Sequence, residues 1–211
     1  MYLQDVQTRL SLGAIVLAAG AGSRYSEEPG AKLLAPIGEE PMLARVLREL
    51  RAYGPASTVV VLGSGAAVVE RAVDWADEIR VRNHEPERGL ASSLQIGIDA
   101  LRALPDTFDG AFIVLGDQPR LRAETLHALE AAVVTTRAAS RPAVVPRYDE
   151  PGPRNPVLLL RPAWNWVDEL EGDHGLGALM VDRPEAVFEV AISGTMPDID
   201  TPDDLAQLRS D

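Results

Sequence analysis

Two cationic side chains and a pair of glycines near the N-terminus are the first residues in this sequence that could do chemistry. Gly20 and Gly22 allow a sharp turn whose backbone N–H groups face outward with no side chain in the way. Arg24 and Lys32 follow within ten residues of Gly22. Arg24 can meet a phosphate as a two-pronged donor and Lys32 as a point charge. The pattern indicates a triphosphate-binding loop, although an ordinary glycine turn between a strand and a helix has the same sequence features.

Two aspartates far apart in the chain form a second candidate group. Asp117 comes directly after an apolar run that predicts a buried strand, and Asp200 follows the last such run. In a parallel sheet, residues just beyond the carboxyl ends of the strands lie where ligands bind. Two carboxylates there would suit Mg²⁺, whose usual ligands are carboxylate oxygens, water and substrate phosphates. The alternative is that Asp117 caps the following helix and that Asp200 or Thr201 caps the terminal one.

Two better-known phosphate loops are excluded by spacing. The P-loop pattern GxxxxGK[ST] does not occur in the sequence. The dinucleotide pattern GxGxxG is met only at Gly20 and Gly22, because Tyr25 occupies the third glycine position, where helix and strand must pack closely. The loop therefore belongs to another class of phosphate site.

These residues need a scaffold, and the hydrophobic pattern alternates between strands and helices. Such alternation predicts a doubly wound, mostly parallel α/β sheet with its ligands at the carboxyl ends of the strands. The length and the 46% hydrophobic content suit one domain over residues 1–211. The predicted strands are Ala14–Leu17, Ser57–Gly63, Glu78–Val81, Asp109–Gly116, Ala143–Pro146, Val157–Leu160 and Ala186–Ile192, and the clearest helices begin near Pro41 and span Ala66–Trp75, Ala123–Ala138 and Asp203–Leu208.

The charge of the chain limits its partners. A formal net charge of −12 argues against binding of DNA or RNA, because nucleic-acid-binding surfaces are usually basic. Any site for a small anion must therefore be locally basic, which draws attention to Lys32, the single lysine of the chain. No apolar stretch approaches eighteen residues and the first ten residues contain no signal-like apolar run, so we expect a cytoplasmic protein with no membrane partner. The absence of cysteine excludes disulfides and thiolate metal sites.

Two further loops carry candidate ligand contacts. A polar loop that ends at Gly89 precedes an amphipathic helix, and Ser92 or Ser93 either caps that helix or faces a ligand. A second loop, rich in proline and glycine, contains Arg154 and Asn155. Long loops on a rigid scaffold often bind substrate.

Five strings, in order along most of the chain, resemble the MobA-like nucleotidyltransferases. LAAGAGSR, followed by Lys32, resembles the family signature LAAGxGxR…K, and GDQP at 116–119 resembles GDxP. Residues 89–97 resemble the segment GxxxSxxxG, RNPV at 154–157 resembles GNPV, with Arg154 in place of glycine, and DIDTPDD at 198–204 resembles [DN]x[DN]TPxD. The turn GDHG at 172–175 resembles the GDxG turn of molybdenum cofactor cytidylyltransferases and points to them within the family.

The resemblance implies a Rossmann-like fold of the GT-A type and a set of site residues. It implies that Asp117 and Asp200 hold Mg²⁺, with Asp198 as an outer-shell partner, and that Lys32 and Arg24 act in catalysis. The residues implied to bind the nucleotide are Leu17, Ala18, Ala19, Gly20, Gly22, Ser23, Arg24, Lys32, Gly89, Ser93 and Asn155.

The implied reaction transfers a nucleotidyl group to a phosphorylated acceptor, such as molybdopterin or molybdenum cofactor, and releases pyrophosphate. LAAG rather than LAGG at residues 17–20 favours CTP over GTP, because the Cβ of Ala19 would occupy space that a purine needs. A molybdoenzyme would then be a partner. Two alternatives remain open: an NAD(P)-dependent reductase on the same fold, and a non-catalytic protein that binds a nucleotide or cofactor.

Overall fold

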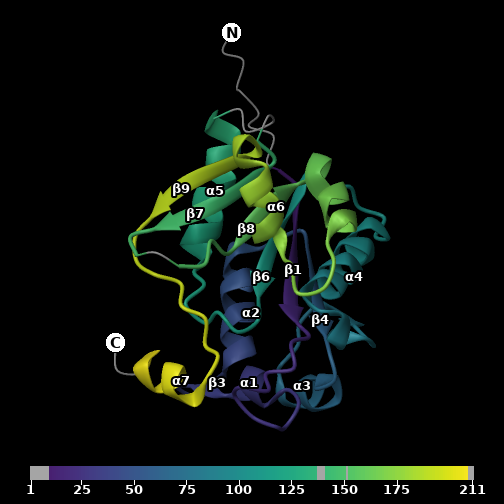
Figure 1. The fold of residues 1–211 in the computed structure, drawn as a ribbon, viewed down its shortest axis with the longest axis vertical. Helices are drawn as coiled ribbons and strands as arrows, with labels where there is room; N and C mark the ends of the chain where they lie inside the picture. Colours follow the sequence, from purple (N-terminus) through teal and green to yellow (C-terminus); the bar gives the residue numbers. More distant parts are fainter. Residues whose placement is uncertain (1–9, 137–140, 151, 209–211) are drawn as a thin grey trace.

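Seven strands of the computed structural model form one sheet in the order β5-β4-β1-β6-β8-β7-β9, with helices on both faces (Figure 1). The structure describes residues 10–136, 141–150 and 152–208, so most of the N-terminal ten residues and the predicted helix end at Ala138 lie outside the described residues. The strands are β1 (Leu12–Ala18), β4 (Ser57–Leu62), β5 (Ile79–Arg82), β6 (Gly110–Leu115), β7 (Ala143–Tyr148), β8 (Val157–Leu160) and β9 (Val187–Ile192).

The sheet is mostly parallel, as the sequence predicts, with one reversed strand. β1 lies inside the sheet, parallel to β4 on one side and to the central strand β6 on the other. β8 runs antiparallel to both β6 and β7, whereas β7 and β9 are again parallel. Every residue of β1 is buried, which explains its unbroken apolar sequence.

Two hydrophobic layers hold the helices against the sheet. On one face, α2 (Met42–Tyr53), α3 (Ala66–Ala72) and α5 (Ala123–Thr136) pack in one cluster. On the other face, α4 (Leu90–Arg102), the 3-10 helix η3 (Arg161–Glu169) and α6 (Leu176–Asp182) pack in a second cluster. The fold is therefore doubly wound, and the predicted fold class is confirmed.

Several small elements near the predicted loop do not stand out in the sequence. Lys32 lies on a four-residue helix, α1 (Ala31–Leu34), and a short hairpin of β2 (Pro36–Ile37) and β3 (Glu40–Pro41) follows it. The remaining elements are the 3-10 helices η1 (Pro86–Arg88) and η4 (Pro184–Ala186) and the terminal helix α7 (Pro202–Leu208). None of the helices that the described residues form is long and apolar enough to cross a membrane.

The C-terminal segment returns along the molecule to the first loop. After β9 at the far edge of the sheet, the chain runs down to α7, which lies near α1 and β3 (Figure 1). Ile199 is buried in a small cluster with Ala35, Ile37, Met42 and Leu205. This anchor places residues 198–200 beside the loop that begins after β1.

Candidate active site

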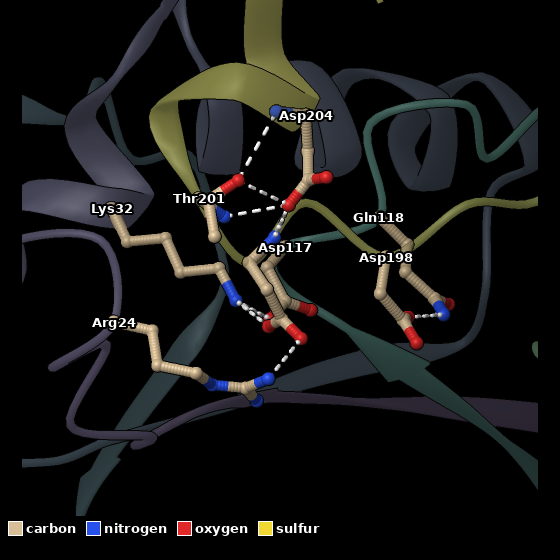
Figure 2. Close-up of polar contacts among 8 residues, drawn as sticks. Arg24, Lys32, Asp117, Gln118, Asp198, Thr201 and Asp204 are labelled. Atoms are coloured by element: carbon tan, nitrogen blue, oxygen red, sulfur yellow. Dashed lines mark hydrogen bonds and ion pairs between the residues drawn. The ribbon is translucent and has the colours of Figure 1, made fainter.

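Four charged residues from three distant parts of the chain converge at the carboxyl end of β1 and β6. The Nζ atom of Lys32 donates to Oδ2 of Asp117 at 2.6 Å and to Oδ1 of Asp200 at 2.9 Å. Arg24 pairs with the other oxygen of Asp200 at 3.0 Å. Figure 2 shows Lys32 and Arg24 pointing toward these carboxylates from one side. We call these four residues the charged cluster.

Local backbone features place each member of the charged cluster. Gly22 has a φ of +61°, which favours glycine, and a Cβ there would come within 3.2 Å of the Lys32 Cβ. Asp117 follows β6 after one glycine. Thr201 accepts from the Asp204 backbone N–H and so caps α7, while the Asp204 carboxylate accepts from Thr201 in return. The capping alternative is therefore confirmed for Thr201, whereas the carboxylates of Asp117 and Asp200 accept from Lys32 instead.

The charges within the cluster nearly balance. Burial disfavours the charge on Lys32, but the ion pairs and hydrogen bonds with Asp117 and Asp200 outweigh burial and raise the pKa of Lys32 above its ordinary value. Lys32 therefore stays cationic at neutral pH. Two cations and two carboxylates then share the site, and each cation has a carboxylate partner.

A partly buried hydrogen bond that the sequence does not reveal connects the two aspartate segments. The side-chain amide of Gln118 donates to Asp198 at 2.6 Å, beside the charged cluster (Figure 2). Gln118 is only 2% exposed. Burial raises the pKa of Asp198, against the lowering effect of Gln118, and the nearby Asp117 and Asp200 raise it further. The outer-shell role of Asp198 stays a prediction, but its observed partner is Gln118.

A pocket of about 420 Å³ opens next to the charged cluster. Six of the predicted site residues line it: Leu17, Ala19, Gly20, Gly89, Ser93 and Asp117. Ala18 does not, because strand side chains alternate and Ala18 packs into the opposite hydrophobic layer. Gly22 and Ser23 lie outside the lining as well. We call this cavity the nucleotide pocket, after the prediction made for its residues.

The start of α4 closes one side of the nucleotide pocket in an unexpected way. Gly89, with a φ of +87°, is the residue before the helix, and a Cβ there would lie 2.3 Å from the Gly172 backbone. Ser92 and Ser93 sit inside the first turn rather than capping it, so the capping alternative for them is wrong. Both serines accept hydrogen bonds from Asn83, at 2.8 and 2.9 Å. Sequence reasoning missed Asn83, although a polar residue directly after a strand at the ligand edge is a usable signal.

A second pocket of about 320 Å³ adjoins the nucleotide pocket. Leu17, Leu90 and Leu115 line both cavities. The predicted contact Asn155 lines this second pocket rather than the first, together with Arg154. The turn at 172–175 lies between them, since Asp173 borders the nucleotide pocket and Gly175 the second pocket. We call this cavity the adjoining pocket.

The acidic members of the cluster suit a divalent cation. Asp117 and Asp200 already bring two carboxylate oxygens onto one positive atom, the Lys32 Nζ. Carboxylates are hard oxygen donors of the kind that Mg²⁺ and Mn²⁺ prefer. In the described part of the chain, no group of three or more His, Asp or Glu side chains could hold a metal alone. A cation here would therefore need further ligands from water or from a bound phosphate.

Fold and site together define an α/β protein of the GT-A type, with the predicted phosphate loop directly after β1. Comparison with protein families gives the same answer independently. The model of the MobA-like NTP transferase domain matches residues 14–187. The chain belongs to this family.

Individual relatives agree with that placement. Bifunctional protein GlmU of Chromobacterium violaceum is 44% identical over 124 residues, which cover 58% of this chain and 26% of GlmU. The chain spans about a quarter of the length of the curated relatives that it matches.

Solved structures match over nearly the whole chain. Rv0371c of Mycobacterium tuberculosis is 29% identical with a TM-score of 0.83, covering 97% of this chain and 100% of that one. A complex of Rv0371c with manganese is 26% identical with a TM-score of 0.78, covering 95% and 98% of the two chains. A nucleotidyl transferase from Methanothermobacter shares the fold, at 22% identity, a TM-score of 0.75 and coverage of 95% and 96%.

Proposed function

We propose that this protein is a nucleotidyltransferase that transfers a nucleotidyl group from a nucleoside triphosphate to a phosphorylated small molecule. The observation that carries the proposal is the convergence of Arg24, Lys32 and Asp200 on Asp117, the member of the charged cluster that lines the nucleotide pocket. Membership of the MobA-like NTP transferase family supports the same activity.

In the proposed reaction, a phosphate oxygen of the acceptor attacks the α-phosphorus of the triphosphate. A new oxygen–phosphorus bond forms, and the bond from the α-phosphorus to the bridging oxygen breaks. Pyrophosphate leaves with that electron pair. The attacking oxygen of an ionised phosphate carries no proton, so this step needs no general base. The contribution of the protein is then positioning and charge stabilisation.

The cations of the charged cluster are suited to the leaving phosphates. The Lys32 side chain is only 11% exposed, and it contacts Asp117, which lines the nucleotide pocket, so Lys32 would stabilise negative charge that develops on the leaving phosphates. Arg24 has a side chain that is 75% exposed, so it is free to turn from Asp200 toward a triphosphate. Its planar fork suits two phosphate oxygens at once.

The carboxylates of Asp117 and Asp200 would hold the divalent cation that this family's chemistry implies. When bound, such a cation supplies further charge neutralisation on the triphosphate. The manganese complex of Rv0371c supports a divalent cation in this family, and Mg²⁺ is our proposal for this chain. Asp117 and Asp200 would exchange Lys32 for the cation, and Lys32 would turn to the phosphates.

We propose CTP as the nucleotide and molybdopterin or molybdenum cofactor as the acceptor. Ala19 is 4% exposed and lines the nucleotide pocket, so its methyl group narrows the space available to a base. The adjoining pocket is the proposed site of the acceptor, since it shares a wall with the nucleotide pocket and offers Asn155 and Arg154 as polar contacts. The molybdoenzyme that would receive the product is the proposed partner.

A pyrophosphate-release screen tests the proposal. Purified protein is mixed with each of four nucleoside triphosphates and with candidate phosphorylated acceptors, in the presence of Mg²⁺. Release that requires both substrates, and that is lost in Asp117→Asn, supports a nucleotidyltransferase. Binding of nucleotide without any release would support the non-catalytic alternative instead. The comparisons give no support to the reductase alternative, and mixing with NADPH while following its absorbance checks it.

A further inference from the structure

A chain of buried hydrogen bonds leads from the end of β5 into the nucleotide pocket. Asn83 is 4% exposed and immediately follows β5. Its carbonyl Oδ1 accepts from the backbone N–H of Glu85 at 2.9 Å. That bond fixes the orientation of the amide, because only the oxygen can accept from an N–H. The amide nitrogen of Asn83 must therefore face the two serines of α4.

The two protons of the Asn83 amide are divided between neighbouring serines. Nδ2 donates to the Oγ of Ser92 at 2.8 Å and to the Oγ of Ser93 at 2.9 Å. Each hydroxyl oxygen is thus an acceptor toward Asn83, and each serine must direct its own proton elsewhere.

The serines differ in where that proton goes. The hydroxyl of Ser92 donates to the backbone carbonyl of Gly89 at 2.8 Å, which completes its hydrogen bonds inside the protein. The hydroxyl of Ser93 has no acceptor among the residues that the structure describes, although Ser93 is only 4% exposed. Ser93, and not Ser92, lines the nucleotide pocket. An unused donor at a buried position points to a partner in the pocket.

We infer that Asn83 is a positioning residue that turns the Ser93 hydroxyl into a hydrogen-bond donor toward an acceptor atom on the base or ribose of the bound nucleotide. This inference rests on the proposed function, since it requires a nucleotide in that pocket. Asn83 would not touch the ligand itself. Because Asn83 donates to the Ser93 hydroxyl oxygen, the hydroxyl proton is the group that Ser93 can offer to the pocket. A ligand atom that is itself a donor would face this proton and be disfavoured.

Four variants test the inference by isothermal titration with CTP at constant Mg²⁺, with thermal unfolding measured in parallel. Ser93→Ala removes the donor and is expected to weaken the Kd for CTP about tenfold, the upper scale for one neutral hydrogen bond. Asn83→Asp keeps the shape but replaces the donor with an acceptor, which draws the Ser93 proton away from the pocket, and we expect a similar loss. The double variant should lose no more than either single variant, because both remove the same contact.

Ser92→Ala is the matched control, since Ser92 has the same partner and lies one residue away. We expect a lower melting temperature with an unchanged Kd for CTP. In steady state, Ser93→Ala should raise KM and leave kcat nearly unchanged, because a contact to the base or ribose is present before and during the reaction.

Three results would overturn the inference: equal loss of affinity in Ser92→Ala and Ser93→Ala, additive losses in the double variant, or wild-type affinity in Ser93→Ala. The comparison of the two serine variants stands even where Asn83→Asp does not fold. A wild-type protein that binds no nucleotide would overturn the proposed function, and with it this inference.

Discussion

Replacing Lys32 with methionine tests whether the charged cluster is held together by its central cation. Methionine keeps most of the length of the lysine side chain and removes its charge. The carboxylate oxygens of Asp117 and Asp200 that contact Nζ lie no more than about 5.5 Å apart, the sum of their two distances to Nζ. Without Lys32, the two negative charges face each other across that distance, and Arg24 remains as the partner of Asp200 alone.

The magnitude of the effect follows from that separation. Two unit charges about 5.5 Å apart repel by about 3 kcal/mol at an effective dielectric constant of about 20. The side chains of Asp117 and Asp200 are 28% and 33% exposed, so solvent reduces this energy to about 1 to 3 kcal/mol. For a chain of this size, that corresponds to a melting temperature about 3 to 10 °C lower in the absence of a divalent cation.

Two measurements separate the structural and catalytic roles of Lys32. Differential scanning calorimetry with and without Mn²⁺ should show a larger stabilisation by the metal in Lys32→Met than in wild type, because the cation no longer competes with Lys32 for Asp117 and Asp200. Pyrophosphate release should show a kcat about a hundredfold lower, the scale for losing a preorganised charge partner in the transition state. Unchanged stability without metal, or a change confined to KM, would refute the reasoning.

Three further perturbations test other parts of the account. Asp117→Asn should abolish pyrophosphate release while circular dichroism shows an intact fold, and near wild-type release in Mg²⁺ would contradict the metal assignment. Ala19→Gly should lower the ratio of kcat/KM for CTP over GTP; a wild-type preference for GTP would refute the cytidylyltransferase assignment. Arg51→Met should lower the free energy of unfolding by about 2 to 3 kcal/mol in urea titrations, because Arg51 neutralises the buried Glu78 at 2.6 Å. Burial opposes ionisation of Glu78, but the hydrogen bonds from Arg51 and the Ala76 backbone N–H outweigh burial and lower the pKa of Glu78. The stability that this ion pair supplies is therefore present above pH ~4.5 and is lost as the pH falls through the lowered pKa. An acid transition in Arg51→Met identical to that of wild type would contradict this account.

The sequence predicts most of this scaffold because its local signals agree with the final packing. The apolar run before Gly20 becomes the fully buried strand β1, and the run before Asp117 becomes β6. β1 and β6 are parallel neighbours; a glycine turn follows β1 and Asp117 follows β6. This arrangement is sufficient to place Arg24, Lys32 and Asp117 at the carboxyl ends of these two strands. The observed ends of the helices and strands differ from the predicted ends by a few residues, since tertiary contacts decide where a helix or strand stops.

The features that sequence reasoning missed depend on contacts between distant segments. The reversed direction of β8 is set by its neighbours β6 and β7, and nothing in the residues Val157–Leu160 distinguishes parallel from antiparallel pairing. The approach of Asp200 to Lys32 spans 168 positions and depends on the burial of Ile199. Gln118 and Asn83 looked like ordinary loop residues, because their partners, Asp198 and the serines of α4, are identified only by the fold.

The arrangement of charges bears on how so acidic a chain would bind the proposed triphosphate. With a net charge of −12, the molecule as a whole repels a triphosphate, so attraction must come from within a short distance of the site. Lys32 and Arg24 supply two positive charges there, but Asp117 and Asp200 cancel them in the charged cluster. A nucleotide alone therefore meets a site with little net attraction. Under the proposed function, a nucleotide that arrives with a divalent cation would offer the two carboxylates a new partner and would free Lys32 and Arg24 for the phosphates. The same four residues would then favour the complete metal–nucleotide complex over either component alone.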